Sequence, residues 1–350
     1  MTRIFLKFGK FFAALVILFA VAFVLPIGFG RPESPPPLSA IDGVVSGRTA
    51  ASELPPYSEF VARDDVSLAY RAYAGRPGKG VAVVLHGSSG TSAVVHNLAV
   101  HLADVGISTY SLDLRGHGRS GKLGDVSYVG QYQNDLADFA RYLRSRHPGE
   151  RLVLVGHSSG GSVVLRTASE RAAAHWDGFL ALSPFIASGR PFSRPNEGGW
   201  TNVSVPRIIA ISIANGLGID AFDDLSVMAM AVPEGAGADR ARTYSFRLLS
   251  SLNLPRDWFA ALAGIRKPTF VLIGAADELF YASAYAVEFE KANKGIDVET
   301  LPRIGHMSML FETSALDRAV AVTQTLLAVC FRAEKKNMAA AAKPLGYECD

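Results

Sequence analysis

The sequence predicts an α/β fold in which a mostly parallel sheet is flanked by helices. Uncharged apolar runs at 81–85, 152–155 and 268–273 are typical of strands buried on both faces. Segments with helical spacing of apolar residues alternate with these runs, which is the pattern of a parallel sheet covered on both sides. Each run ends in a polar loop, and ligand sites in such sheets lie at the carboxyl ends of the strands.

Local signals place the other elements. Asp64 and Asp65 are turn residues between the first two strands. Val94, Leu98 and Leu102 recur every four residues, as on one face of a helix. The predicted order is strand 59–63, strand 67–74, strand 81–85, helix 93–105, strand 107–112, helix 130–146, the strand from 152, a helix to about 174, strand 178–182, an irregular insert, strand 268–273, helix 283–293, strand 296–301 and helix 314–331.

Length and composition limit the number of domains and the classes of partner and scaffold. The 350 residues accommodate one large domain or two small ones, and a hydrophobic content of 49% supports a sizeable core. The formal net charge of +3 is weak and no block of Lys and Arg occurs, so nucleic acid is not an expected partner. Two cysteines, Cys330 and Cys349, exclude a disulfide-dense scaffold and fit no zinc spacing; whether they pair stays open.

Residues 1–30 are predicted to lie outside the globular fold. Arg3, Lys7 and Lys10 precede an uncharged run from Phe11 to Gly30, and ~20 apolar residues span a bilayer as a helix. A cleaved signal peptide is the alternative, but its apolar part is usually shorter and residues 26–30 offer a poor cleavage site. We expect an uncleaved membrane anchor over 11–30, with the remainder exported. Cleavage would instead give a secreted or periplasmic protein.

The globular domain is expected over residues 57–332. A Pro-rich tether at 31–56 precedes it, because closely spaced prolines favour an extended, fairly stiff chain. A flexible tail at 333–350 follows it.

The segment around Ser158 carries the strongest chemical signal. A buried strand from Leu152 stops at Gly156-His157-Ser158-Ser159-Gly160, and a helix follows. Gly at both flanking positions permits a sharp strand-to-helix turn that exposes a serine hydroxyl as a nucleophile. The helix amides that follow suit a developing negative charge. The alternative is a tight turn in which Ser158 only caps the helix.

A serine nucleophile needs a base, and the base needs a group that orients it. His306 lies in a loop between the strand at 296–301 and the last helix, and imidazole suits general base and acid work. Asp277 follows the strand at 268–273 and could hold the working tautomer of His306. The chain order Ser158, Asp277, His306 fits this strand topology. Glu278 is the nearest substitute acid and is otherwise expected to be a solvated neighbour.

Two backbone amides should bind the oxyanion, those of Ser159, which opens the helix, and Ser88, in the loop after Leu85. Ser88 could instead be an ordinary turn residue. The polar residues nearby are expected to be structural: His86, Asp113, His117 and His157.

Between Pro184 and Lys267 the strand and helix alternation breaks down. We expect a mainly helical cap over about 185–266, made of short helices and loops, that roofs over Ser158. Its apolar residues should pack the cap and wall an acyl pocket: Trp200, Ile208, Ile209, Ile211, Ile213, Met228, Met230 and Phe246.

These motifs together resemble the α/β-hydrolase superfamily over roughly residues 59–331. The matching stretches are the elbow around Ser158, His86-Gly87, residues 113–120, Asp277 and Gly305-His306. The Arg-Gly-His-Gly stretch at 115–118 and the inserted cap look like the lysophospholipase and monoacylglycerol-lipase branch. The resemblance implies a serine hydrolase without metal or organic cofactor, with Ser158, Asp277 and His306 as the triad and Ser88 and Ser159 as oxyanion amides.

We therefore expect a membrane-tethered serine hydrolase that cleaves carboxylic esters through an acyl-enzyme. An apolar cap and a membrane anchor favour lipid-like esters such as monoacylglycerols or lysophospholipids. Two alternatives stay open. An amidase or peptidase uses the same triad, and a catalytically inactive, tethered binding module could share the fold.

Overall fold

The computed structural model describes residue 14 and residues 17–36, 54–233 and 235–328. The predicted tail at 333–350 and both cysteines lie outside the described residues. So do most of the predicted tether and the first part of the predicted anchor.

In the described part of the chain, the main sheet has eight strands in the order β1-β2-β4-β3-β5-β6-β10-β11. Every pair from β4 to β11 is parallel, whereas β2 pairs antiparallel with both β1 and β4. This confirms the predicted mostly parallel sheet. The strands are β1 (Tyr57–Val61), β2 (Ser67–Tyr73), β3 (Val81–Leu85), β4 (Ser108–Leu112), β5 (Leu152–His157), β6 (Gly178–Leu182), β10 (Thr269–Gly274) and β11 (Ile296–Leu301).

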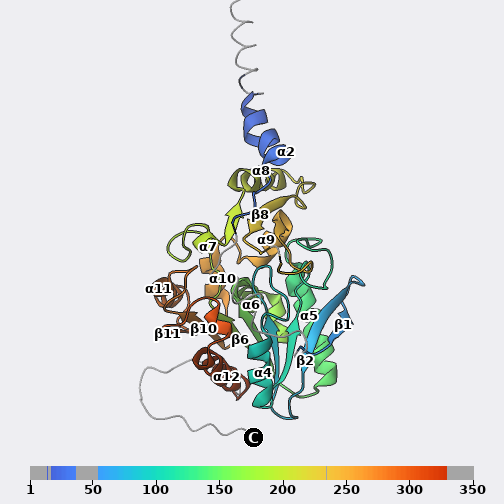
Figure 1. Cartoon of the computed structure of the whole chain (residues 1–350), viewed down its shortest axis with the longest axis vertical. Helices are drawn as coiled ribbons and strands as arrows, with labels where there is room; N and C mark the ends of the chain where they lie inside the picture. Colours follow the sequence, from blue (N-terminus) through green and yellow to red (C-terminus); the bar gives the residue numbers. More distant parts are fainter. Residues whose placement is uncertain (1–13, 15–16, 37–53, 234, 329–350) are drawn as a thin grey trace, which may run out of the picture.

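Helices cover both faces of this sheet (Figure 1). In β3, Val83 packs into the core beneath α5, α6 and α11, and its neighbour Val84 packs into the opposite core beneath α4 and α12. The two-residue period of a strand thus feeds two hydrophobic cores from one apolar run. The helices of the main domain are α4 (His96–Asp104), α5 (Gln131–Arg146), α6 (Ser159–Ser169), η3 (Arg171–His175), α11 (Ala282–Ala292), η4 (Ser308–Leu310) and α12 (Thr313–Ala328).

Most of the chain between β6 and β10 forms a cap beyond the sheet, in the upper part of the molecule in Figure 1. It contains the helices α7 (Asn196–Gly199), α8 (Val205–Gly216) and α9 (Phe246–Leu252), and the antiparallel strands β7 (Thr201–Val203), β8 (Ser226–Met230) and β9 (Thr243–Ser245). The last helix of the insert, α10 (Trp258–Gly264), packs against α6 and α11 of the main domain. The insert is mainly helical, as predicted, but its small three-stranded sheet was not predicted. β8 is apolar and mostly buried, and such a short run has no period that separates a strand from a helix.

The amino-terminal segment lies against the cap. The π-helical turn η1 (Ala20–Val24) and the helix α2 (Leu25–Phe29) sit beside α8 (Figure 1). In the described ranges, no helix combines the length and the apolar character needed to cross a membrane. The first residues of the predicted tether are also packed, because Pro32 is buried and the Asn202 side-chain amide donates to the Glu33 carbonyl at 2.9 Å.

Candidate active site

Ser158 occupies a strained turn between β5 and α6. Its backbone has φ +56° and ψ −122°, a conformation that non-glycine residues rarely adopt. A Cβ on Gly156 would lie 2.4 Å from the Gly160 carbonyl oxygen, and a Cβ on Gly160 would lie 2.4 Å from the His86 carbonyl oxygen. Only glycine fits at these two positions, as the spacing of the motif predicted.

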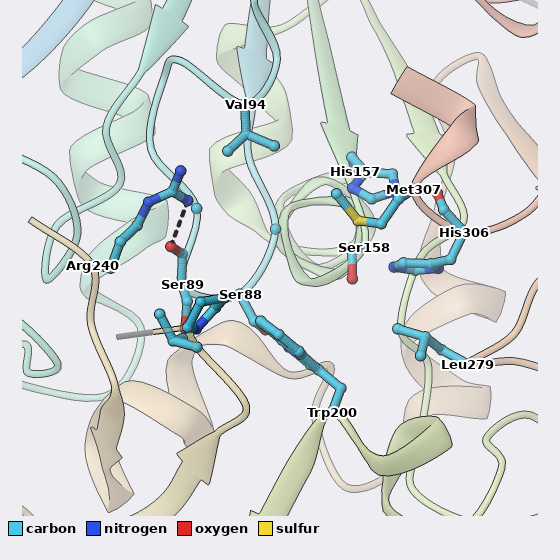
Figure 2. A pocket seen from close by; sticks show the side chains of 14 residues that line it. Ser88, Ser89, Val94, His157, Ser158, Trp200, Arg240, Leu279, His306 and Met307 are labelled. Carbon is cyan, nitrogen blue, oxygen red and sulfur yellow. Dashed lines mark hydrogen bonds between the residues drawn. The ribbon is translucent and has the colours of Figure 1, made fainter. Parts of the chain in front are cut away.

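Asp277 and His306 form a buried hydrogen-bonded pair. His306 Nδ1 lies 2.9 Å from Asp277 Oδ2, and the other carboxylate oxygen accepts from the amides of Leu279 and Phe280, each at 2.9 Å. Burial raises the pKa of Asp277, but His306 and the two amides outweigh burial and lower the pKa overall. An ionised Asp277 keeps the proton on Nδ1 of His306, so Nε2 is left as an acceptor. The imidazole points toward Ser158 across one pocket that both residues line (Figure 2).

Two further side chains fix the backbone of His306. Glu278 Oε2 accepts from the His306 amide at 2.7 Å, and His157 Nε2 contacts the His306 carbonyl oxygen at 2.9 Å. Glu278 is exposed, as expected for a solvated neighbour. The expectation was nevertheless incomplete, because the carboxylate also reaches back to hold the histidine loop.

The loop after β3 meets the start of α6 beside Ser158. Ser88 Oγ donates to Ser159 Oγ at 3.1 Å, which brings together the two residues predicted to supply oxyanion amides. A Cβ on Gly87 would lie 2.9 Å from the Ser158 Cβ, so the loop approaches the elbow as closely as glycine allows. Amides at the first turn of a helix have no intrahelical partner and can bind an anion.

Tyr244, on the cap strand β9, holds the loop after β3 by hydrogen bonds. Its hydroxyl accepts from the Ser89 amide at 2.7 Å and lies 2.6 Å from His117 Nε2. Ser89 Oγ also donates to the Ala241 carbonyl at 2.6 Å. Tyr244 could not be predicted as a site residue, because it lies 155 positions from Ser89, inside the insert. No local motif marks it.

Two adjoining pockets meet at Ser158, with Ser88, Trp200 and Leu279 lining both. The second is walled largely by apolar side chains: Phe185, Trp200, Val203, Ile208, Met228, Leu249, Leu252, Leu279 and Phe280. Of the predicted wall residues, Trp200, Ile208 and Met228 line it.

The other predicted wall residues do not line either pocket. Ile209 and Ile213 face outward and are 53% and 51% exposed. Ile211 and Met230 are buried in the packing of the cap, and Phe246 is partly buried.

Comparison with known proteins identifies the family. A family model described as serine aminopeptidase, S33, matches residues 76–314. The chain belongs to this family of α/β hydrolases. The predicted resemblance to the monoacylglycerol-lipase branch is confirmed by the relatives described next.

The chain is 32% identical over 87 residues to the monoacylglycerol lipase of Mycolicibacterium smegmatis, covering 25% of this chain and 31% of that protein. It is 30% identical over 109 residues to the human monoglyceride lipase, covering 31% of this chain and 36% of that protein. The chain thus spans about a third of the length of these curated relatives.

Solved structures share the fold. A soluble variant of the monoglyceride lipase of Saccharomyces cerevisiae matches with a TM-score of 0.56 at 16% identity, covering 81% of this chain and 97% of that chain. A membrane phospholipase A described as a bacterial virulence factor matches with a TM-score of 0.55 at 20% identity, covering 94% of this chain and 100% of that chain.

Buried polar residues around the site of this α/β hydrolase have the predicted structural roles. His86 Nε2 accepts from the Leu114 amide at 3.1 Å, and its Nδ1 donates to the Gly87 carbonyl at 2.9 Å. Asp113 accepts from the amides of Ser92 and Arg119 at 2.6 and 3.0 Å. These bonds tie together the two loops at the carboxyl ends of β3 and β4.

Buried neutral histidines should make this α/β hydrolase sensitive to acid. Burial lowers the pKa of His86 to about 4, and that of His117 and His157 to about 3, from an ordinary 6.5. As the pH falls below 6.5 the unfolded chain binds protons that the folded chain does not, so the free energy of unfolding decreases. The loss at pH 5 is about 2 kcal/mol for each ring. Urea unfolding at pH 7 and pH 5 measures this; equal free energies at both would contradict it.

Proposed function

We propose that this α/β hydrolase cleaves carboxylic esters by a serine mechanism. Ser158 attacks the carbonyl carbon while His306 accepts the hydroxyl proton, and the amides of Ser88 and Ser159 bind the oxyanion. His306 then protonates the leaving alcohol. Water activated by His306 hydrolyses the acyl-enzyme. The observation that carries the proposal is the 2.9 Å contact between His306 Nδ1 and the buried Asp277 Oδ2, because His306 lines the same pocket as Ser158.

The substrate we propose is a lipid-like ester, such as a monoacylglycerol or a lysophospholipid. The apolar walls of the pocket beside Ser158 favour the binding of an acyl chain at this position. The names of the relatives, monoacylglycerol lipase and monoglyceride lipase, support the same class. We further propose that the domain is exported and attached to a membrane through residues 11–30; release after cleavage of this segment is the alternative.

Chain length tests the substrate proposal. We expect kcat/KM on soluble esters to rise about fourfold per methylene until the pocket is full, because each buried methylene contributes about 0.8 kcal/mol. Ile208→Trp should abolish this preference by filling the pocket. Its matched control is Ile209→Trp, since the neighbouring side chain faces outward. A preference that survives Ile208→Trp would contradict the assigned pocket. Faster cleavage of matched amides would favour the amidase alternative.

Tyr244→Phe tests the support of the oxyanion loop. The change leaves the buried Ser89 amide without its acceptor, and such a loss costs about 1–3 kcal/mol. We expect kcat to fall about tenfold with little change in KM, because the oxyanion develops only in the transition state. The control is Tyr73→Phe on β2, whose hydroxyl contacts His96 Nδ1 at the start of α4 at 2.9 Å. Equal losses in both variants would contradict a specific role for Tyr244.

A further inference from the structure

Large exposed hydrophobic side chains gather at the outer end of the cap. On α8 and the residue that follows it, Val205, Ile209, Ile213 and Leu217 recur every four residues and are 51–74% exposed. The amino-terminal segment beside α8 exposes a second set: Ile17, Leu18, Phe19, Val21, Val24, Leu25 and Phe29. The helices α2 and α8 lie next to each other in the upper part of Figure 1. An extended apolar patch of this kind marks an interaction site.

The inward side of α8 is apolar as well. Ala210, Ile211 and Ala214 are buried in the cap, and Ile208 lines the pocket beside Ser158. A helix that is hydrophobic all round is normally covered on every side. No part of the protein that the structure describes covers the exposed apolar stripe on α8, so something else is expected to cover it.

Arg207 joins α8 to the amino-terminal segment. Its Nε and Nη2 donate to the carbonyl oxygens of Pro26 and Ile27 at 3.0 and 2.9 Å, and its Nη1 donates to the Ser226 carbonyl on β8 at 2.9 Å. Carbonyls in the last turn of a helix have few partners within the helix, and Arg207 donates to two of them in α2. Arg207 is buried, so this clamp is shielded from water. These hydrogen bonds hold α8 of the cap next to α2, so both helices are exposed to the same environment.

Sequence and charge indicate what covers this patch. Residues 205–217 carry no charge except the buried Arg207, and the run from Phe11 to Gly30 carries none. Arg3, Lys7 and Lys10 precede that run, a pattern typical of chain that enters a bilayer. Asp220, Asp223 and Asp224 follow α8 and would repel an anionic surface, which favours apolar insertion over attraction to charged headgroups.

We propose that the outward face of α8 inserts into a lipid surface beside the amino-terminal segment, and that Arg207 fixes the cap in this orientation. The inference rests on the proposed membrane attachment but not on the proposed ester hydrolysis. Ile208 then lies within about one helix diameter, 10 Å, of the inserted face. The acyl pocket is thereby held directly beneath the lipid, where a lipid-like ester can enter it.

Fluorescence of an introduced indole tests the insertion without catalysis. The full chain carrying Ile209→Trp is reconstituted into phosphatidylcholine vesicles, with or without dibrominated phosphatidylcholine, and the emission of the unsubstituted chain is subtracted. The matched control is Val287→Trp, a position 51% exposed on α11 of the main domain. We expect brominated lipid to reduce the added emission of Ile209→Trp about twofold or more, with no loss for Val287→Trp. Because insertion is apolar, high salt should leave this quenching unchanged.

Several results would overturn the insertion. These are equal quenching at both positions, no quenching at position 209, and a chain that does not float with the vesicles. An indole at 209 already shielded in a lipid-free dimer would show that a second copy covers the face.

Arg207→Gln tests the clamp. It should abolish the quenching at position 209 while the chain stays on the vesicles, and near-ultraviolet circular dichroism checks the fold. Phe222→Ala, which removes the ring packed edge-on to Phe23 at 6.1 Å, serves if Arg207→Gln does not fold. Quenching that persists in a folded clamp variant would refute the role of Arg207.

Discussion

Ser158→Ala is expected to lower kcat on an ester by about 10⁴-fold or more while the protein stays folded. The methyl side chain retains the Cβ that the elbow accommodates at φ +56° but removes the nucleophile. His306→Ala should cause a comparable loss, because an unactivated hydroxyl is a poor nucleophile. Steady-state kinetics of both variants measure the effect.

The control for these variants is His101→Ala, a partly buried histidine on α4 whose Nδ1 contacts only the backbone of its own helix. It should keep nearly full activity. A folded Ser158→Ala protein with more than a tenth of the original kcat would show that another residue carries the reaction.

Asp277→Asn should reduce kcat by about 10⁴-fold, because an amide favours the wrong tautomer of His306. In the unsubstituted protein Oδ2 of Asp277 faces Nδ1 at 2.9 Å, and the lowered pKa keeps the carboxylate ionised at neutral pH. Measurement of kcat against pH for both proteins checks this, since loss of the acid should not be recovered by raising the pH.

Glu278→Gln is the matched comparison for Asp277→Asn. The side chain of Glu278 has only to accept a hydrogen bond from the His306 amide, and it need not be ionised. A glutamine side chain retains an acceptor oxygen for this bond. We expect at most about a tenfold loss of kcat. A larger loss in Glu278→Gln than in Asp277→Asn would move the orienting role to Glu278.

Features that follow from a local motif, or from the topology of a parallel sheet, could be predicted from the sequence. The elbow around Ser158 is determined by two glycines and a buried strand, all within a short segment. Asp277 and His306 can be found because parallel strands end at one edge of the sheet, so position after a strand is enough to bring them together. The two core-forming faces of β3 follow from its apolar run.

Features that depend on the insert could not be predicted. The cap sheet β7-β8-β9 pairs segments that are too short to show a distinguishing period. Tyr244 acts through a hydrogen bond to Ser89 across a long sequence separation. Ile209 and Ile208 are neighbours of the same residue type, and only the packing of α8 shows that one faces outward and the other lines the pocket.

We propose above all that Ser158 is an activated nucleophile. The most direct test is to react the purified full chain with a fluorophosphonate, digest it and locate the modified residue by mass spectrometry. We predict one modification, on Ser158, that is absent in Ser158→Ala and strongly slowed in His306→Ala. Modification of a different residue, or none on a folded protein, would contradict the account.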